Sequence, residues 1–434
     1  MPALTHSRPV RLAAGFAMVA TAALVLSGCG RVDNADSAAA TAAIDDKPAT
    51  GTVSLWAPDG DANALDDTMA AFKADNPDLD LEVTLIPESE YNTKLQAAIA
   101  SGTGPDIAQT YTEAQAGFIK GDAFAAVPDG LVDEDSFFPG SWAAGEIDGT
   151  AYTVPWYAYT YTLVYRKDIA EAAGLSAPTT WDEMIPFEKG LMAAGATKGL
   201  GASVGWDSYN GQDLTQLVWQ AGGELINDDE TEWTLDTPEM IEAIEYNASY
   251  FTSGVADVSG PGFLDSQPYF VTGKTASSIT GPWVIGQFDA VAEQDGWTAE
   301  NVGTATVPAG SAGSIGAIAG GSLGVLADSD NQESAWKVIR YLAESDTQIA
   351  QYESYGSLPA VQSSWEDPAI ADQPLLDAFF DQLQDTRSYP QRTTWLQIAT
   401  QMGAEMESVA KGQETAEEAA ANLQSFADGV GTGE

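Results

Sequence analysis

The sequence of 434 residues contains a single histidine and a single cysteine. The histidine is His6, and the cysteine is Cys29. A globule built from the residues after Cys29 therefore has no imidazole and no thiol. This excludes Ser-His-Asp hydrolysis, cysteine nucleophiles, histidine-ligated zinc and disulfide frameworks. For catalysis, only carboxylate, Lys, Tyr or Ser chemistry remains.

Basic residues are scarce as well. The chain has 17 Lys and Arg against 64 Asp and Glu, a formal net charge of −47 at pH 7. A field of that sign repels nucleic acid and disfavours polyanionic ligands, so neutral or cationic ligands are preferred. Acidic residues spread over solvated faces are the simpler explanation of the excess. The charge therefore excludes classes of partner without naming one.

A long hydrophobic run occurs at the amino terminus, from Leu12 to Leu26, preceded by Arg8 and Arg11. Its length suits a secretion signal and falls short of the roughly 20 apolar residues of a membrane span. It ends in Leu26-Ser27-Gly28-Cys29, which resembles the bacterial lipobox, whose cysteine becomes lipidated. We therefore expect residues 1–28 to be a lipoprotein signal peptide and Cys29 to anchor the protein to the extracytoplasmic face of the cell membrane.

Large apolar side chains are few in residues 29–50, which are mainly Ala, Thr, Asp and Ser. Such a segment buries too little surface to offset the entropy of ordering, so we expect a flexible tether. The remaining chain is long enough for two domains, and no low-complexity linker divides it. Two lobes would then be joined by short crossings.

The globule opens with strand and helix patterns in alternation. Residues 52–56, 81–86 and 106–110 are β-rich, and helical patterns run through 65–75 and 91–99. The order β-α-β-α-β predicts a parallel sheet, and the carboxyl ends of its strands form a natural ligand crevice.

The string Gly102-Thr103-Gly104-Pro105-Asp106-Ile107 after this pattern resembles the opening of the extracellular solute-binding protein family that includes maltose-binding protein. Further strings follow in the order of that family across the whole globule: Tyr152–Tyr157, Leu163–Asp168, Pro178–Glu183, Val271–Ala276, Gly281–Trp283, Glu333–Ile339 and Gly356–Ala360.

The resemblance implies an α/β, two-lobe periplasmic binding protein-like fold of type II, with a ligand cleft between the lobes. Each lobe would hold a mixed, mainly parallel sheet flanked by helices. The expected first lobe is 51–156 plus 314–360, and the second is 157–313 plus 361–434. Hinge crossings are expected near 155–157, 310–316 and 359–363. Glycine-rich residues 310–316 suit that role because they resist few backbone rotations.

The implied function is that of a monomeric substrate-binding component of an ABC importer. It would capture a neutral di- or oligosaccharide, close by hinge motion and dock on the permease subunits. No cofactor is implied. Two alternatives stay open: a non-sugar solute such as a polyamine, compatible solute or peptide, and a secreted carboxylate glycosidase.

Sugar recognition needs flat aromatic platforms for C–H faces and planar polar groups for hydroxyls. Trp283 is the best platform, because Pro282 fixes its turn and the matching family tryptophan stacks on sugar. Other candidates follow the first and third strands, or match the first crossing, a loop of the second lobe and the last ligand-binding segment of the family. The full expected set is Asp59, Asp61, Tyr111, Glu113, Trp156, Tyr157, Trp206, Asn210, Trp283, Arg392 and Trp395.

Two expectations are negative. Trp181, Trp219 and Trp336 are expected to be structural and to touch no ligand. Residues from Asp59 onward begin like a calcium-binding EF-hand loop, but Ala64 and Ala70 stand where Gly and Glu are required, so no metal site is predicted. For Arg392, an ion pair within this acidic protein is the alternative to ligand contact.

Overall fold

The structure is a computed structural model of the chain, and it describes residues 43–59, 65–202, 204–261 and 266–433. The expected signal peptide, Cys29, the first part of the expected tether and Asp61 lie outside the described residues. No helix in the described part of the chain is long and apolar enough to cross a bilayer.

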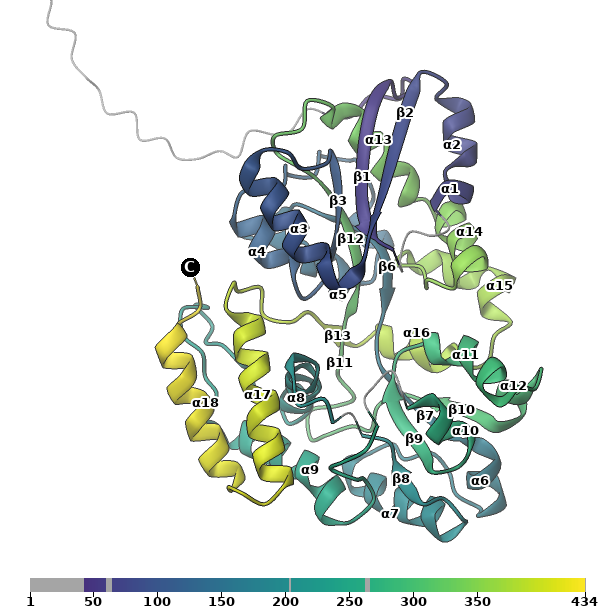
Figure 1. Cartoon of the computed structure of the whole chain (residues 1–434), viewed down its shortest axis with the longest axis vertical. Coiled ribbons are helices and arrows are strands. Elements are labelled where there is room, and N and C mark those ends of the chain that lie inside the picture. Colours follow the sequence, from purple (N-terminus) through teal and green to yellow (C-terminus); the bar gives the residue numbers. More distant parts are fainter. Residues whose placement is uncertain (1–42, 60–64, 203, 262–265, 434) are drawn as a thin grey trace, which may run out of the picture. The chain divides into compact units, whose positions relative to one another are not determined.

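The first of the two main sheets has five strands in the order β2-β1-β3-β12-β6 (Figure 1). Strand β1 pairs in parallel with β2 and β3, and β12 is antiparallel to both β3 and β6. Their bounds are β1 (Gly51–Pro58), β2 (Leu79–Ile86), β3 (Ile107–Tyr111), β6 (Val154–Tyr159) and β12 (Ala319–Val325). Strands β1, β2, β3 and β6 therefore all end at one edge, where β12 begins.

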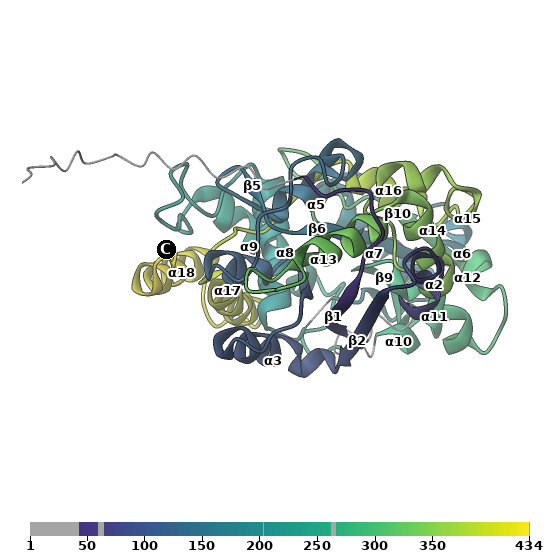
Figure 2. The same cartoon turned by 90° about the horizontal axis from the view of Figure 1, so that it is seen from above.

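Helices pack on this sheet and complete the first lobe. The alternating strand and helix order predicted from residues 52–110 is observed. Helix α13 lies beside β1 and β12 (Figure 2). The helices of this lobe are α1 (Leu65–Thr68), α2 (Ala70–Asp75), α3 (Glu88–Ser101), α4 (Gln115–Lys120), α5 (Pro139–Ala144), α13 (Gln332–Leu342), α14 (Ser345–Tyr355), α15 (Pro368–Ala371) and the short 3₁₀ turns Glu134–Ser136 and Gln362–Glu366.

The second sheet has four strands in the order β10-β7-β9-β8. Only β8 and β9 run parallel, so the expected mainly parallel pairing does not extend to this sheet. The reason is that β7 enters directly from the first sheet and runs against both of its neighbours. The ends of β8, β9 and β10 share one edge with the start of β7; the bounds are β7 (Thr162–Arg166), β8 (Lys198–Leu200), β9 (Thr275–Thr280) and β10 (Val302–Ala305).

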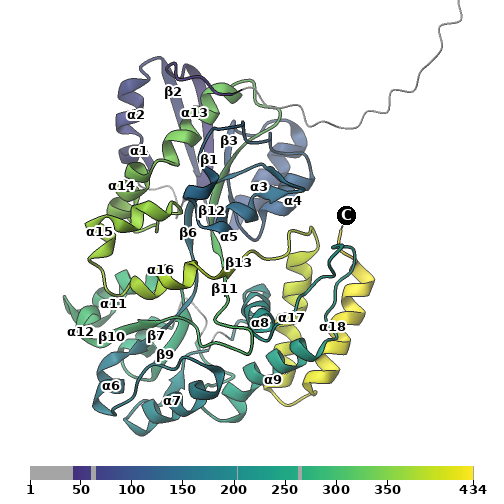
Figure 3. The same ribbon diagram turned by 180° about the vertical axis from the view of Figure 1, so that it is seen from behind.

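The helices of the second lobe surround this sheet and extend beyond it (Figure 3). They are α6 (Lys167–Ala172), α7 (Trp181–Ala193), α8 (Ser208–Gln220), α9 (Pro238–Thr252), α10 (Gln267–Val271), α11 (Trp283–Ala292), α12 (Trp297–Asn301), α16 (Asp377–Leu383), α17 (Trp395–Ala410) and α18 (Ala416–Val430). Two short ribbons, β4 (Glu146–Ile147) with β5 (Thr150–Ala151) and β11 (Gly316–Ala317) with β13 (Thr386–Arg387), complete the fold.

The chain changes sheets at Thr160 and Tyr161, the two residues between β6 and β7. The expected lobe boundary between Trp156 and Tyr157 falls inside β6, because an unbroken run of buried residues continues to Ala158, next to the last residue of that strand. The return passage lies between β10 and β12, in 306–318, and includes the expected crossing 310–316.

The third passage also lies later in the chain than predicted. Pro359 forms a bridge with Tyr157, and Val361 forms one with Phe137. Both partners belong to the first lobe, so the expected crossing at 359–363 is still part of that lobe. The chain reaches the second sheet with α16, which packs on β10 and β7.

Helices α8 and α17 approach each other closely at two glycines. A Cβ atom on Gly211 would lie 2.1 Å from the backbone oxygen of Ala399, and one on Gly403 would lie 2.3 Å from that of Asp207. Larger residues would force the helices apart. This contact holds the first turn of α8 in a fixed position at the sheet edge.

The last part of the expected tether is packed against the first lobe. Ala49 is buried, and its backbone N–H donates to Asn76 Oδ1 at 2.6 Å. The Asp45 carboxylate accepts a hydrogen bond from the Nζ of buried Lys337 at 2.7 Å, which lowers the pKa of Asp45 far below its usual range. Residues 43–50 are thus not a flexible tether, because their few side chains have specific partners on α13.

Candidate ligand-binding site

Four aromatic side chains meet where the two sheet edges are joined. The rings of Tyr157 and Tyr159 stack with centroids 6.4 Å apart and an interplanar angle of 10°. The Trp283 indole is edge-on to Tyr159, at 5.2 Å and 84°, and to Tyr161, at 6.1 Å and 89°. The first two residues end the first sheet and the last two stand at the edge of the second, so the aromatic cluster Tyr157–Tyr159–Tyr161–Trp283 spans both lobes.

Trp283 is held in this cluster by the turn before it. It follows β9, is the first residue of α11, and is preceded by Pro282 in helical conformation. A Cβ on Gly281 would lie only 1.9 Å from the indole, so the ring folds back over this glycine. The indole is half-buried, which leaves part of its surface accessible.

Two carboxyl groups, one from each lobe, interact electrostatically with Tyr161 of the cluster. Glu113 follows β3 in the first lobe, and Asp213 lies on α8 in the second. Burial raises the pKa of Tyr161, and so do the negative charges of Asp213 and Glu113. Burial, reinforced by the charge of Asp207, raises the pKa of Asp213 to about 7. The charges of carboxyl groups from both lobes therefore act on the same phenol.

Tyr209 adds an exposed aromatic surface beside these acids. It occupies the first turn of α8 and is 56 % exposed. Partial burial raises the pKa of Tyr209. The negative charges of Glu113 and Glu88, both in the first lobe, raise it further. The region therefore combines aromatic faces with carboxylates, the two kinds of group that sugars require.

The structure places several predicted residues at this edge, although contact with a ligand stays a prediction for each. Trp283 and Tyr157 belong to the aromatic cluster, and Gln109 donates to the Tyr157 hydroxyl at 3.5 Å. Tyr111 ends β3 and is half-buried. Asp59 follows β1, and its backbone N–H donates to the carbonyl of Ile86 at 2.9 Å.

Trp156 and Trp395 are both buried in hydrophobic core, and Trp156 is less exposed than its neighbour Tyr157, at 2 % against 7 %. Alternate side chains of a strand face opposite ways, so Trp156 points away from the face that Tyr157 and Tyr159 share. Trp395 is 1 % exposed and stacks on Tyr389 at 5.4 Å and 17°. Trp156 nevertheless contacts one member of the cluster, since its ring lies edge-on to that of Tyr157 with centroids 5.8 Å apart.

Arg392 is engaged elsewhere. Its guanidinium forms an ion pair with the carboxylate of Glu230, and its Nε donates to the backbone oxygen of Glu230 at 3.2 Å. The structure thus shows the ion pair considered as the alternative for this residue.

Trp206 directly precedes Asp207, the N-cap of α8, and Asn210 lies in the first turn of that helix. Trp206 has a φ of 53° and packs against Phe251 with ring centroids 5.5 Å apart. Asn210 is buried and closes a capping box with Asp207, the N-cap of α8. Both residues therefore have structural roles, and Asn210 in addition lines a pocket of the second lobe.

Sequence reasoning missed Tyr159, Tyr161 and Asp213 as site residues. Tyr157, Tyr159 and Tyr161 recur at period two, the spacing that puts side chains on one face of a strand. Asp213 lies three residues beyond Asn210, the spacing of neighbours on one helix face. These spacings were the available signals. Trp219 and Trp336 are buried, and Trp181 lines the same pocket as Asn210. That none of the three touches a ligand stays a prediction.

Comparison with known proteins agrees with this geometry. Residues 57–349 match the family model described as bacterial extracellular solute-binding protein. The chain is 26 % identical over 314 residues to the lactose-binding protein of Rhizobium radiobacter, covering 69 % of this chain and 68 % of the relative. It is 24 % identical over 419 residues to the galactooligosaccharide-binding protein of Bacillus subtilis, covering 92 % of each.

Among solved structures, the sugar-binding protein MalE of Xanthomonas citri superposes with a TM-score of 0.80 at 27 % identity. The match covers 88 % of this chain and 97 % of that one. The two-lobe α/β fold of type II is thereby established. The proteins of this family bind solutes for ABC importers outside the cytoplasm and are not enzymes, which removes the glycosidase alternative. This chain belongs to the bacterial extracellular solute-binding proteins.

Proposed function

We propose that this protein captures a neutral sugar, a di- or oligosaccharide, at the aromatic cluster and delivers it to the permease of an ABC importer. The observation that carries the proposal is the meeting of Trp283 with Tyr159 and Tyr161 at the joined sheet edges. An indole flanked by phenols offers apolar surface to the C–H face of a pyranose.

The carboxyl groups around the cluster supply the polar half of recognition. Asp213 and Glu113 lie on different lobes, and the charges of both raise the pKa of the same phenol, Tyr161. A carboxylate accepts hydrogen bonds from sugar hydroxyls, and a protonated carboxyl also donates one. With a pKa of about 7, Asp213 is present in both forms near neutral pH. The same charges disfavour phosphorylated or carboxylated sugars.

Capture is proposed to proceed by closure of the lobes about the passages between the sheets. Residues 160–161 and 306–318 connect β6 with β7 and β10 with β12. Rotation about these segments changes the separation of Glu113 from Asp213 and Tyr209, which lie on opposite lobes. A ligand that bonds to both sides stabilises the closed form by that difference in contacts.

We also propose that residues 1–28 are a signal peptide, that Cys29 is lipidated and that the protein works as a monomer anchored to the membrane. The hydrophobic run and the Leu26–Cys29 string support anchoring. With residues 43–50 packed on the first lobe, the flexible part of the tether would be confined to the residues before them.

The first test is a thermal-shift screen of the purified protein with mono-, di- and oligosaccharides, and with spermidine and glycine betaine for comparison. A sugar at 100 times its dissociation constant should stabilise the fold by roughly 2.7 kcal/mol. Trp283→Ala should weaken the binding of this sugar by up to about tenfold, since an aromatic platform contributes about 0.5–1.5 kcal/mol beyond simple burial.

Tyr269→Ala is the matched control, because Tyr269 is an exposed aromatic residue of the same lobe that packs against Lys274 instead of the cluster. It should bind sugar like the wild type. A shift with spermidine alone, and none with any sugar, would replace the sugar by a cationic solute.

A further inference from the structure

The side chain of Gln382 holds the passage between β10 and β12 at two points. This residue lies on α16 in the second lobe and is 1 % exposed. Its Oε1 accepts the backbone N–H of Val307 at 2.9 Å, and its Nε2 donates to the backbone carbonyl of Ser314 at 2.8 Å. The Ser314 hydroxyl in turn donates to the carbonyl of Val307 at 2.6 Å. One buried amide therefore fastens both ends of residues 307–314 to a helix of the second lobe.

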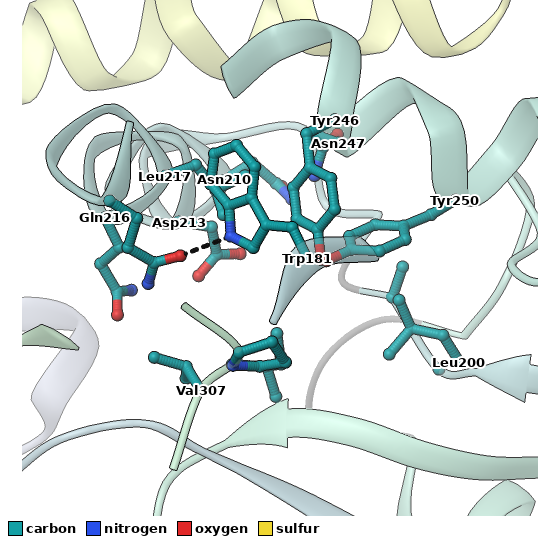
Figure 4. A pocket seen from close by; sticks show the side chains of 15 residues that line it. Trp181, Leu200, Asn210, Asp213, Gln216, Leu217, Tyr246, Asn247, Tyr250 and Val307 are labelled. Carbon is teal, nitrogen blue, oxygen red and sulfur yellow. Dashed lines mark hydrogen bonds between the residues drawn. The ribbon is translucent and has the colours of Figure 1, made fainter. Parts of the chain in front are cut away.

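Two buried glutamines of α8 hold the same passage from another helix. Gln220 Nε2 donates to the carbonyl of Ile315 at 2.8 Å, and Gln216 Oε1 accepts the backbone N–H of Ala317 at 3.2 Å. Gln220 is itself fixed in place, because the indole N–H of Trp181 donates to its Oε1 at 2.8 Å, drawn as the dashed line in Figure 4. The attachment to the second lobe thus extends to Ala317.

The glycine-rich segment 310–316 packs on the backbone of α8 as well. The N–H of Ala312 donates to the backbone carbonyl of Gln220 at 2.8 Å. A Cβ on Gly310 would lie 2.4 Å from the same oxygen. Glycine at this position serves the close approach of two backbones, and the segment does not rotate freely.

The first lobe begins two residues after Ala317. Ala319 pairs with Tyr159 of β6. Gly320 has a φ of 142°, and a Cβ there would lie 2.2 Å from a backbone oxygen of β6, so the two strands are tightly packed at this point. The change from one lobe to the other is therefore confined to the backbone around Ile318.

The other passage that joins the two sheets is equally short. Strand β6 pairs with β12 as far as Tyr159, and β7 pairs with β9 from Thr162 onward. The hydroxyl of Thr160, which lies between them, donates to the carbonyl of Ala317 at 2.8 Å. This hydrogen bond keeps the two passages side by side where each changes lobe.

We propose that Gln216, Gln220 and Gln382 form an amide bracket that makes residues 307–317 a rigid part of the second lobe, so that closure bends these two passages at 160–161 and at Ile318. The inference rests on the proposed function, capture by closure of the lobes, and adds the positioning residues that determine where the hinge lies. A free glycine-rich segment would allow the lobes many relative orientations, most of which are lost when they close on a solute. The bracket removes that freedom before the solute binds.

The first test uses the wild type without a ligand. Hydrogen exchange followed by mass spectrometry measures the protection of peptides that cover residues 307–317. Because the bracket engages backbone groups along this segment, it should exchange about a hundredfold or more slower than an unstructured peptide of the same sequence. Exchange as fast as in that peptide would overturn the bracket.

The second test compares Gln382→Met with Gln348→Met. Methionine keeps the shape of the glutamine and removes its amide. Gln348 is the matched control, since it is also 1 % exposed and its Oε1 accepts the N–H groups of Ala360 and Val361 at 2.9 and 3.0 Å. These partners belong to the first lobe alone. Melting temperatures establish that both variants fold.

The distance between the lobes distinguishes a hinge effect from a loss of stability. Spin labels are attached to Gln96→Cys on α3 and Lys189→Cys on α7, two exposed positions on different lobes. Cys29→Ser removes the native cysteine, so that each label has one site. Pulsed electron paramagnetic resonance then measures the distribution of distances between the labels.

Gln382→Met should broaden this distribution and speed the exchange of residues 307–317 by about tenfold, the factor that one or two lost hydrogen bonds give. Gln348→Met should leave both as in the wild type, even where it lowers the melting temperature equally. Equal broadening in the two variants, or none in Gln382→Met, would overturn the inference.

Ser311→Pro tests the inference without removing a glutamine. The N–H of Gly313 donates to the carbonyl of Gly310, so Ser311 is the second residue of a four-residue turn, where proline is favoured. The substitution gives up one hydrogen bond, from the Ser311 hydroxyl to the carbonyl of Ala221 at 3.2 Å. The distance distribution should stay unchanged, because the stiffened segment does not bend. A narrower or shifted distribution would show that residues 310–316 are the hinge.

No sugar enters these measurements, so a failure of the bracket and a failure of the proposed sugar site are told apart.

Discussion

At the scale of single residues, Glu188 is a carboxyl group inside the core of the second lobe. Ser277 donates to its Oε1 at 2.7 Å, whereas Oε2 has no hydrogen-bond partner among the described residues. The backbone of β8 passes close by, since a Cβ on Gly199 would lie 2.4 Å from Oε2. Burial raises the pKa of Glu188 from 4.5 to about 8. The native protein therefore holds this proton at neutral pH, unlike the unfolded chain.

The consequence is a pH dependence of stability with a defined sign. Between pH 4.5 and 8 the native state binds a proton that the unfolded state has lost, so the free energy of unfolding falls as pH rises. The loss from this residue is on the order of 4 kcal/mol by pH 8. Glu188→Gln should remove this slope and be more stable than the wild type at pH 8. Urea unfolding at pH 5, 6, 7 and 8 measures the difference; parallel curves for the two proteins would contradict a buried neutral carboxyl group.

Single residues also show where prediction from sequence succeeds and fails. The position of Trp283 could be predicted, because it follows a strand in a turn fixed by Pro282, while its contact with a sugar stays a prediction. That Trp156 points away from the face of Tyr157 and Tyr159 could be predicted from the alternation of side chains along its strand. The burial of Trp395 and the pairing of Arg392 with Glu230 could not, because their partners lie far away in the chain and no local pattern reports a tertiary contact.

At the scale of elements, the N-terminal cap of α8 both stabilises the helix and positions side chains of the candidate site. Its N-cap is Asp207, whose side chain accepts from the Tyr209 N–H at 3.0 Å, and Asn210 completes the capping box. Gly211 allows close contact with α17 just beyond this turn. The cap therefore determines how Tyr209 and Asp213 are presented.

Two substitutions at Asp207 separate the cap from the charge. Asp207→Ala should lower the free energy of unfolding by about 1 kcal/mol, the usual value of a helix N-cap, and should weaken sugar binding as the first turn loosens. Asp207→Asn keeps a good cap and should retain the stability, while removal of the negative charge lowers the pKa of Asp213. Chemical denaturation measures the free energy of unfolding of the two variants, and calorimetry measures their affinity for the sugar. Equal stability of both would show that the cap contributes nothing.

Elements were more predictable than their arrangement. The β-α-β-α-β order of residues 51–111 follows from hydrophobic periodicity and is observed. The predicted lobe crossings lie too early by a few residues in β6 and by more after Val361. The buried run of β6 continues to Ala158, and Pro359 and Val361 still pair with residues of the first lobe. The packing of residues 43–50 depends on Lys337, nearly 300 positions away, and composition alone indicated a tether.

At the scale of the whole molecule, one sign of charge dominates. The sequence carries 64 acidic and 17 basic residues. The cations that the structure describes in ion pairs mostly have an exposed carboxylate as partner, and such pairs contribute only about 0–1 kcal/mol each. Repulsion among the remaining carboxylates opposes the compact state. The same excess keeps polyanions away from the aromatic cluster.

Salt screens both the ion pairs and the repulsion among carboxylates. Screening the ion pairs lowers the stability of the fold and screening the repulsion raises it, so the larger of the two decides how the melting temperature changes. Raising NaCl from 0.01 to 1 M shortens the screening length from about 30 to about 3 Å, which weakens both the few attractive pairs and the many repulsions. Because the repulsions are far more numerous, the melting temperature of the ligand-free protein should rise by several degrees. The rise should be largest at low salt, where screening changes most, and should be equal for NaCl and KCl. A decrease would show that the ion pairs, and not the net charge, control the electrostatic stability of this fold.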